Sequence, residues 1–231
     1  MNIVVVGASG GIGTALVRQL QSDGHHLFTI SHKNTLSDTQ CDITDPSAVC
    51  AAFERIVSGG FAPECVIVAS GVFEDDLVPT YTRALLDKNF EVNFFGVLNV
   101  IDAVLPHFLS AGKGQIIALS SIAALRPNKR GVGYPASKAA LSLAMRGFDL
   151  AFRPKGIAFS VACVGPTKTA MWEGGNSFLA ASPEKVARGI ASLIGSRKAV
   201  LYVPFFSTTL ARAALLVPDR VYMALRKILL R

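Results

Sequence analysis

The sequence lacks several patterns that define particular classes of protein. None of its four cysteines forms a C-x-x-C pair or has a histidine at metal-ligand spacing, so they are best read as reduced core or surface thiols. No run of 18 or more uncharged apolar residues is present, so we expect no transmembrane helix. Residues 1–6 lack the basic region and cleavage site of a signal peptide. These absences favour a cytoplasmic protein.

The chain also lacks the features of a nucleic-acid-binding or multidomain protein. Its 231 residues carry a net charge of +7, but basic and aromatic residues do not interleave as they do where bases stack. We therefore expect no nucleic-acid partner. There is no internal repeat, low-complexity stretch or linker. One domain of the larger kind fits this length.

Short apolar runs alternate with helix-like stretches along the whole chain. Continuous Val, Ile and Leu runs are typical of strands buried on both faces, and repeated strand–helix units form a doubly wound parallel sheet. The sequence predicts an α/β fold of about seven strands with helices on both faces. Strands are expected at 3–6, 26–31, 64–69, 115–120, 157–164 and 199–203, with a short one before residue 41. Helices are expected at 11–23, 46–58 (capped by Thr44 or Asp45), 133–153 and 183–194, with two helices or one bent helix at 79–111.

A glycine-rich loop joins the first strand to the first helix. It contains Gly7, Ser9, Gly10, Gly11, Ile12 and Gly13. Glycines let backbone N–H groups approach a pyrophosphate, and a helix N-terminus favours an anion. The loop is therefore a candidate dinucleotide site, although a glycine-rich turn alone has little specificity.

Tyr134 and Lys138 are four residues apart and share one face of a predicted helix. A phenol has an ordinary pKa of about 10, and a nearby ammonium would lower it. Tyr134 could then exchange a proton with an alcohol or a carbonyl oxygen. In isolation, such a pair could equally lie on a solvated surface.

The G-x-x-x-G-x-G loop and the Y-x-x-x-K pair together resemble the short-chain dehydrogenase/reductase family, over about residues 2–204. The resemblance implies a Rossmann-type fold and an enzyme that interconverts a carbonyl and an alcohol with NAD(P). It implies that Tyr134 transfers the proton and that Ser121, rather than its rival Ser120, holds the substrate oxygen. It also implies that Lys138 binds the nicotinamide ribose and that Asn93 holds a water for proton relay.

The second predicted strand ends at Ser31, His32 and Lys33, without the acidic residue that binds the ribose 2′-hydroxyl of NAD. Lys33 would attract a 2′-phosphate, so we expect NADP(H) rather than NAD(H). The loop has Gly10 where NADP-preferring relatives often carry a base, which argues the other way.

Three further segments match cofactor-binding positions by resemblance. Asp42 and Ile43 would contact the adenine, although Asp42 could equally be a turn residue. The family's N-N-A-G segment is replaced by residues ending in Ala69, Ser70 and Gly71. Thr169 would bind the carboxamide beside Pro166 and Thr167, unless this segment is a plain Gly-Pro turn.

The substrate is not identified by the sequence. Met171, Trp172 and Phe178 could line an apolar pocket or pack in the core. The loop before Tyr134 carries basic residues that could meet an anionic substrate or simply be solvated. These residues are Arg126, Lys129 and Arg130.

Residues 205–231 form a basic, apolar tail beyond the catalytic domain at 1–204. The tail carries +4, and an apolar stripe follows a possible cap at Asp219. The stripe is Val221, Leu225, Ile228 and Leu229. The tail could pack on its own domain or a partner subunit, lie on an anionic membrane, or contribute to the substrate mouth.

We therefore predict an NADP(H)-dependent oxidoreductase acting on a small-molecule carbonyl or alcohol, in a homodimer or homotetramer. The alternatives are a non-catalytic redox sensor, a membrane-peripheral protein, and a methyltransferase with a similar sheet.

Overall fold

The computed structural model describes residues 1–33, 37–77, 79–127, 131–171, 180–219 and 221. A seven-stranded, all-parallel sheet forms the centre of the molecule, in the order β3-β2-β1-β4-β5-β6-β7. The chain order reverses between β1 and β4, which creates the switch point where doubly wound sheets bind ligands. The strands are β1 (Asn2–Val6), β2 (His26–Ser31), β3 (Thr39–Gln40), β4 (Cys65–Val68), β5 (Gly114–Ser121), β6 (Ile157–Val164) and β7 (Val200–Val203).

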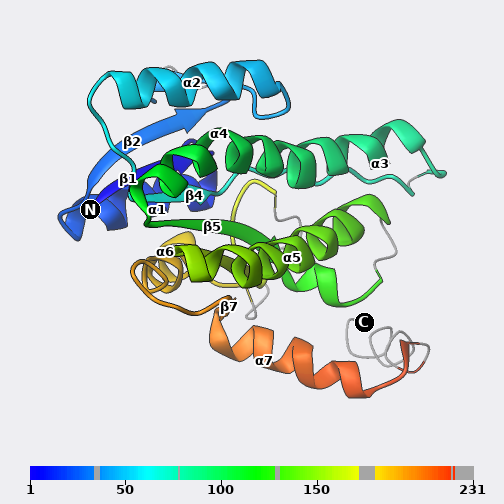
Figure 1. Ribbon diagram of the computed structural model, residues 1–231. Helices are drawn as coiled ribbons and strands as arrows, with labels where there is room; N and C mark the ends of the chain where they lie inside the picture. The colour runs from blue at the N-terminus through cyan, green and yellow to red at the C-terminus, as the bar shows by residue number, and fades with distance from the viewer. Residues whose placement is uncertain (34–36, 78, 128–130, 172–179, 220, 222–231) are drawn as a thin grey trace.

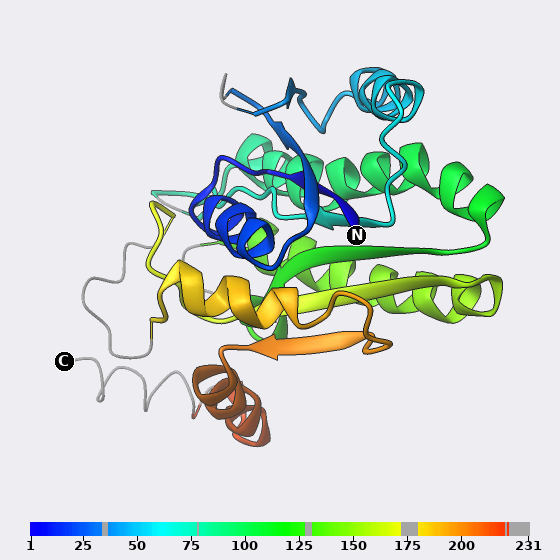
Figure 2. The same ribbon diagram turned by 90° about the vertical axis from the view of Figure 1, so that its left-hand side faces the viewer.

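Helices cover both faces of the sheet, as the continuous apolar strands predict. Val4 and Val6 of β1 face one core, whereas Ile3 and Val5 face the other. The first core contains α2 (Pro46–Ser58), α4 (Gly96–Ala111) and α5 (Gly133–Phe152), and the second contains α1 (Gly11–Ser22) and α6 (Pro183–Ala191). Figure 2 shows α1 and α6 on the opposite side of the sheet from α4 and α5.

The ends of two helices differ in how well the sequence predicted them. Asp45, one of the two candidate caps, accepts hydrogen bonds from the N–H groups of Ser47 and Ala48 at the start of α2. The helix expected at 183–194 ends earlier, at Ala191. The chain then turns through Gly195, which has a φ of +70°.

The segment expected as two helices or one bent helix is a helical run, Arg83–Ala111. It consists of α3 (Arg83–Phe90), a π turn at Glu91–Phe95 and α4. Among the described residues it is long and apolar enough to cross a membrane by length and composition alone. However, Val100, Val104 and Phe108 of α4 are buried in the core, as in a core helix of a globular domain.

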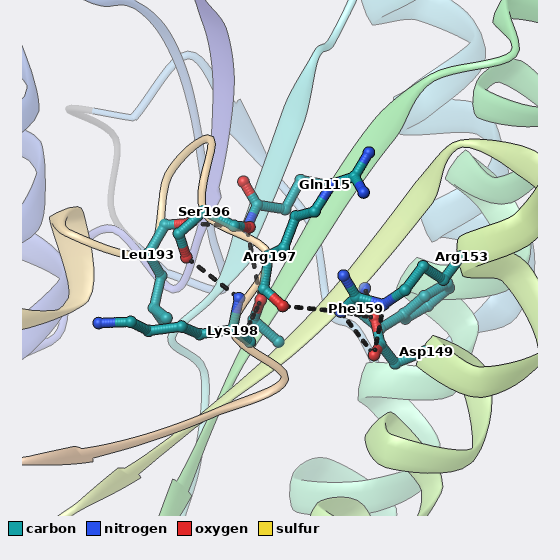
Figure 3. A network of polar contacts seen from close by, with 9 residues as sticks. Gln115, Asp149, Arg153, Phe159, Leu193, Ser196, Arg197 and Lys198 are labelled. Atoms are coloured by element: carbon teal, nitrogen blue, oxygen red, sulfur yellow. Dashed lines mark hydrogen bonds and ion pairs between the residues drawn. The ribbon is translucent and has the colours of Figure 1, made fainter.

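A polar network fixes the turn before β7 to the beginnings of β5 and β6 (Figure 3). Buried Gln115 of β5 donates to the Leu193 carbonyl and accepts from the Gly195 N–H, at 2.8 and 2.9 Å. Asp149 of α5 binds Arg153 and accepts from the Phe159 N–H of β6. The network stabilises the amino edge of the sheet and leaves the carboxyl edge for the site.

Beyond β7, the chain continues into α7 (Phe205–Ala213) and a 3-10 turn at Ala214–Leu216. This helix packs against β7 and against the 3-10 turn Ile122–Leu125 that follows β5. Figure 1 shows α7 outside the edge strand β7, running back toward the side from which α5 begins.

Candidate active site

The glycine-rich loop is packed too closely for side chains at three positions. Gly7 has a φ of +85°, and a Cβ there would lie 2.5 Å from the Ser70 nitrogen. A Cβ on Gly13 would lie 2.0 Å from the Gly7 carbonyl oxygen, and one on Gly11 would lie 2.8 Å from Cγ2 of Thr169. The glycine-rich loop therefore contacts the loop that follows β4 (residues 69–71, here called the β4 loop) and the loop after β6 (residues 165–169). These contacts bring three predicted cofactor segments together.

Helix α1 begins at Gly11 beside this loop, after Gly10 and the exposed Ser9, and Ile12 lies in its first turn. In the described part of the chain no side chain caps this helix. Its N-terminal N–H groups therefore face the same edge of the sheet as the loop, where an anion would be stabilised.

Basic groups gather at the end of β2, next to Asp42. The His32 Nε2 atom lies 3.4 Å from a carboxylate oxygen of Asp42, and His32 and Lys33 are both exposed. Ser31 is buried, and its hydroxyl donates to Ser37. Asp42 also accepts from the N–H and hydroxyl of Thr44, and chiefly this N–H lowers the pKa of its carboxyl. Asp42 thus has the turn role that the sequence left open, and Ile43 beside it is buried in the core.

The β4 loop separates the glycine-rich loop from the proposed proton relay. Ala69 packs against the core of α1 and α6, and Ser70 lies against Gly7. A Cβ on Gly71 would lie 3.1 Å from the Asn93 Oδ1 atom and 3.3 Å from the Lys138 Nζ atom. The space is therefore closed to larger residues, although the family's asparagine and alanine are missing here.

Asn93 lies in the π turn and is fully buried. Its side chain accepts from the Val72 N–H and donates to the Val72 carbonyl, each at 2.9 Å, and also donates to Ser137. The side-chain amide is thus engaged in holding the β4 loop against α5. Such π turns are rare and are often found at functional sites.

The structure distinguishes the two serines at the end of β5. Ser120 is buried, donates to the Lys138 carbonyl at 2.9 Å and accepts from Ser142. Ser121 instead accepts from the Ala123 N–H, and its hydroxyl lies close enough to Tyr134 to lower the pKa of the phenol. Ser121 is therefore the serine beside Tyr134, whereas Ser120 helps pack α5 on the sheet.

Tyr134 lies in the first turn of α5, and Lys138 follows one turn later. Burial raises the pKa of Tyr134, and the nearby Ser121 hydroxyl opposes this in part. The Lys138 Nζ atom lies 6.0 Å from the centre of the Tyr134 ring. The lowering of the Tyr134 pKa by Lys138 together with the positive nicotinamide of an oxidised cofactor stays a prediction. Within the protein alone, burial is the larger effect and favours the neutral phenol.

Lys138 is 4% exposed and donates to the Leu119 carbonyl at 2.9 Å. Burial lowers the pKa of its ammonium to about 8. A group that titrates near neutral pH beside a phenol can exchange a proton with it. The pair is thus suited to proton transfer in either direction.

One residue of the site was missed by the sequence analysis. Asp76 is fully buried, and its carboxylate accepts from the N–H groups of Val132 and Gly133, at 2.7 and 2.5 Å. It thereby caps α5 from a distant loop, immediately before Tyr134. The only signal in the sequence was that Val132, at the start of α5, cannot cap a helix with its own side chain.

The loop after β6 closes the site beside the glycine-rich loop. The Thr167 hydroxyl donates to the Gly165 carbonyl, and the Pro166 carbonyl accepts from the Ala181 N–H. Thr169 lies against Gly11. Residues 165–169 thus form the predicted turn. They also lie beside the glycine-rich loop, where a bound cofactor would pass.

Of the residues predicted to cover the substrate, Met171 is exposed, whereas Trp172 and Phe178 lie outside the described residues. Arg126 binds the carbonyls of Ala214 and Val217 instead of facing solvent. Lys129 and Arg130 lie outside the described residues, as do Leu225, Ile228 and Leu229 of the predicted tail stripe.

All four cysteines are free thiols, and Cys50 alone of them is exposed. Within the described ranges, no group of three His, Cys, Asp or Glu side chains is arranged to hold a metal ion.

Comparisons with known proteins agree with this geometry. A family model described as short chain dehydrogenase matches residues 1–179. An uncharacterised oxidoreductase of Staphylococcus haemolyticus is 26% identical over 204 residues, covering 81% of this chain and 87% of the relative. A 3-ketodihydrosphingosine reductase of Bacteroides thetaiotaomicron is 29% identical over 152 residues, covering 64% of this chain and 55% of the relative.

The fold also matches solved structures. A short chain dehydrogenase of Burkholderia cenocepacia, solved with NADP, superposes with a TM-score of 0.83 at 21% identity, covering 97% of this chain and 96% of the other. The aldohexose dehydrogenase of Thermoplasma acidophilum superposes with a TM-score of 0.76 at 19% identity, covering 87% and 91%. At these identities the likeness concerns the fold.

Proposed function

This chain belongs to the short-chain dehydrogenase/reductase family, and from that premise we propose that it reduces a hydrophobic ketone or aldehyde with NADPH. The family makes it an oxidoreductase that uses a nicotinamide dinucleotide and interconverts a carbonyl and an alcohol. The Ser121 hydroxyl near Tyr134, with buried Lys138 one helical turn away, carries the proposal.

The residues present fit such a cofactor. Side chains at Gly7, Gly11 and Gly13 would collide with neighbouring atoms, so these positions need glycine. The loop leaves the N-terminal N–H groups of α1 available for a pyrophosphate. Thr169 would bind the nicotinamide carboxamide beside Pro166 and Thr167.

We propose that NADPH is preferred over NADH. The end of β2 offers Ser31, His32 and Lys33 and no carboxylate, so a 2′-phosphate would meet hydroxyl and basic groups. Two carboxylates lie near this strand: Asp42 is already bound to Thr44 and paired with His32, and Asp38 is bound to Thr29. We assign the contact with the adenine of the cofactor to Asp42 and Ile43.

Bound NADPH supplies the hydride, and the chain handles the substrate oxygen and the proton. Ser121 holds the carbonyl oxygen with its hydroxyl, which polarises the bond. The Tyr134 hydroxyl donates its proton to that oxygen as the alcohol forms. Because burial raises the pKa of Tyr134, the phenol is protonated at neutral pH, which favours reduction.

Lys138 replaces the lost proton and also holds the ribose. Its pKa of about 8 lets it give up a proton near neutral pH. Asn93 contributes by holding the β4 loop and the π turn, where a water would link Lys138 to solvent. Ala69, Ser70 and Gly71 line the path along the cofactor.

The substrate is proposed to be apolar. Met171, in the segment that would cover it, is exposed and offers an apolar surface. One relative is named 3-ketodihydrosphingosine reductase, and another, from Acinetobacter baylyi, is named fatty acyl-CoA reductase. A long-chain carbonyl therefore deserves the first trial.

We further propose a catalytic domain at residues 1–204, a tail at 205–231 with peripheral membrane contact, and a cytoplasmic homodimer or homotetramer. The outer face of α5 exposes Leu143 and Leu150, at 69% and 81%, which supports association between copies.

The test is a screen of carbonyl compounds of increasing chain length, following NADPH oxidation. We expect turnover that rises with chain length. Turnover of any carbonyl would exclude the redox-sensor alternative. Absence of turnover across the series, with NADPH bound, would instead favour that alternative.

A further inference from the structure

Helix α7 has its polarity reversed relative to an ordinary surface helix. Its buried positions are Ser207 and Thr208, at 7% and 0% exposure. Its outward positions are Phe205 and Phe206, at 79% and 70%. A surface helix normally turns its apolar stripe toward the core, so this arrangement presents aromatic rings to whatever surrounds the protein.

The apolar surface continues beyond the helix. Leu210 is 54% exposed, and Leu216, in the following 3-10 turn, is 89% exposed. We call this surface, made of Phe205, Phe206, Leu210 and Leu216, the α7 outer face.

Contacts at the start of α7 explain why this face must point outward. A Cβ on Gly165 would lie 2.9 Å from the Ser207 Oγ atom and 3.3 Å from Cγ2 of Thr208. The Thr208 hydroxyl donates to the Pro204 carbonyl at 2.8 Å. Only small side chains fit between α7 and the loop after β6, so the large ones lie on the opposite side.

Arg126 fixes the other end of the segment. Its side chain is 12% exposed, donates to the carbonyls of Ala214 and Val217, and lies 3.4 Å from the Asp219 carboxylate. A guanidinium at the end of a helix satisfies carbonyls that the helix leaves unpaired. Arg126 also neutralises Asp219, the single acidic residue of the tail.

Both anchors belong to loops of the active site. Arg126 lies between Ser121 and Tyr134, and Gly165 precedes the segment that contains Thr169. The α7 outer face is therefore held in a fixed orientation relative to the catalytic groups. Figures 1 and 2 both place α7 beyond the edge strand β7.

The charge of the tail indicates what covers this face. Residues 205–231 contain five basic residues and one acidic residue, so two copies brought together through their tails would repel each other. The four side chains expose on the order of 500 Å², below the roughly 800 Å² that each partner of a stable protein interface buries. An exposed apolar face on a segment with a net positive charge is instead typical of segments that lie in the headgroup region of an anionic bilayer.

We propose that the α7 outer face docks on an anionic lipid bilayer. The inference that this face docks on a membrane rests on its exposed apolar residues and on the net positive charge of residues 205–231. The consequence for the substrate, a carbonyl lipid taken from the membrane, rests on the proposed function.

The test is co-sedimentation of the full chain with vesicles of phosphatidylcholine, alone or mixed with phosphatidylglycerol. We expect binding to the mixed vesicles that weakens as salt rises, and a loss of roughly tenfold or more in Phe205→Ser/Phe206→Ser. Tyr81→Ser is the matched control, because Tyr81 is an exposed ring outside the tail, at 56%. NADPH binding should be unchanged in all variants.

Equal binding by the wild type and the double variant would overturn the proposal and assign the attraction to the basic surface as a whole. Absence of binding would also overturn it. So would a change from oligomer to monomer in the double variant, measured by light scattering, because a second copy would then cover the face. None of these outcomes requires turnover, so a failure of docking is distinguishable from a failure of the proposed function.

A second arm compares NADPH oxidation with hexadecanal in mixed vesicles and with butanal in solution. The double variant should lose roughly tenfold with hexadecanal and nothing with butanal. If the double variant oxidised NADPH as fast as the wild type with both substrates, the proposal that the substrate comes from the membrane would be contradicted.

Discussion

The orientation of Tyr134 depends on a carboxylate far from it in the chain. Asp76 caps α5 through two N–H groups, 56 and 57 residues away. Such a contact leaves no local pattern, which is why the sequence indicated Tyr134 and Lys138 but not Asp76. By contrast, the choice of Ser121 over Ser120 followed from spacing, and the effect of the Ser121 hydroxyl on the pKa of Tyr134 supports it.

Asp76→Asn should lower kcat about tenfold and reduce the free energy of unfolding by about 1–3 kcal/mol. An amide has one acceptor oxygen, so one of the two N–H groups would lose its partner in a buried site. Steady-state kinetics and urea unfolding measure the two effects.

The control is Asp87→Asn, which removes an exposed carboxylate paired with Arg83 on α3. It should change both quantities little, since exposed ion pairs contribute at most about 1 kcal/mol. If Asp76→Asn behaves like this control, Asp76 does not position Tyr134.

Lys138 should make stability depend on pH. Its pKa is lowered from 10.5 to about 8 by burial, so between these values the unfolded chain binds more protons and stability rises with pH. Below pH 8 the full cost of burying the charge remains, at most about 3 kcal/mol. Urea unfolding from pH 7 to 10 should show this rise in the wild type relative to Lys138→Met. Parallel curves would contradict the lowered pKa.

At the scale of elements, the helical run Arg83–Ala111 marks what periodicity can and cannot predict. Its apolar pattern located the run and allowed a bend. The π turn at Glu91–Phe95 has no signature of its own, because it arises where Asn93 is held by Val72 and Ser137.

Helix α7 is a second element whose structure the apolar pattern predicts only in part. A pattern of apolar and polar residues indicates a face but not its direction, and the usual rule would place Phe205 and Phe206 inward. The close approach at Gly165, and the Arg126 bonds to residues 88 and 91 positions away, reverse the orientation.

The polar network at the amino edge predicts a purely structural variant. Gln115→Leu would leave the Gly195 N–H without its partner, would remove one of two hydrogen bonds to the Leu193 carbonyl, and should reduce the free energy of unfolding by about 1–3 kcal/mol. The dissociation constant for NADPH should not change, because the network lies at the opposite edge from the glycine-rich loop. An altered constant would mean that the two edges are coupled.

For the whole molecule, the doubly wound parallel sheet followed from buried apolar runs, and the place of the site followed from the rule that such sheets bind ligands at the carboxyl ends of their strands. Three segments predicted from sequence, at residues 7–13, 69–71 and 166–169, lie in contact there. What the sequence could not supply is the set of long-range contacts from Asp76, Arg126 and Gln115 that fix these segments.

Cofactor preference should appear as a shift in global stability. A ligand at 100 times its dissociation constant stabilises the fold by about 2.7 kcal/mol. NADPH should raise the melting temperature more than NADH at equal concentration, and Lys33→Glu should reverse the order, because the new carboxylate repels the 2′-phosphate. Arg18→Glu, the same charge change in α1, is the control. Equal shifts in wild type and Lys33→Glu would remove Lys33 from the cofactor site.

The central claim is that Tyr134 donates the proton for carbonyl reduction, and the most direct measurement is NADPH oxidation by Tyr134→Phe beside the wild type. With the most active carbonyl of the chain-length series, we predict that kcat falls by about 10² to 10⁴ while the dissociation constant for NADPH is unchanged. Turnover by Tyr134→Phe at the wild-type rate would contradict the account.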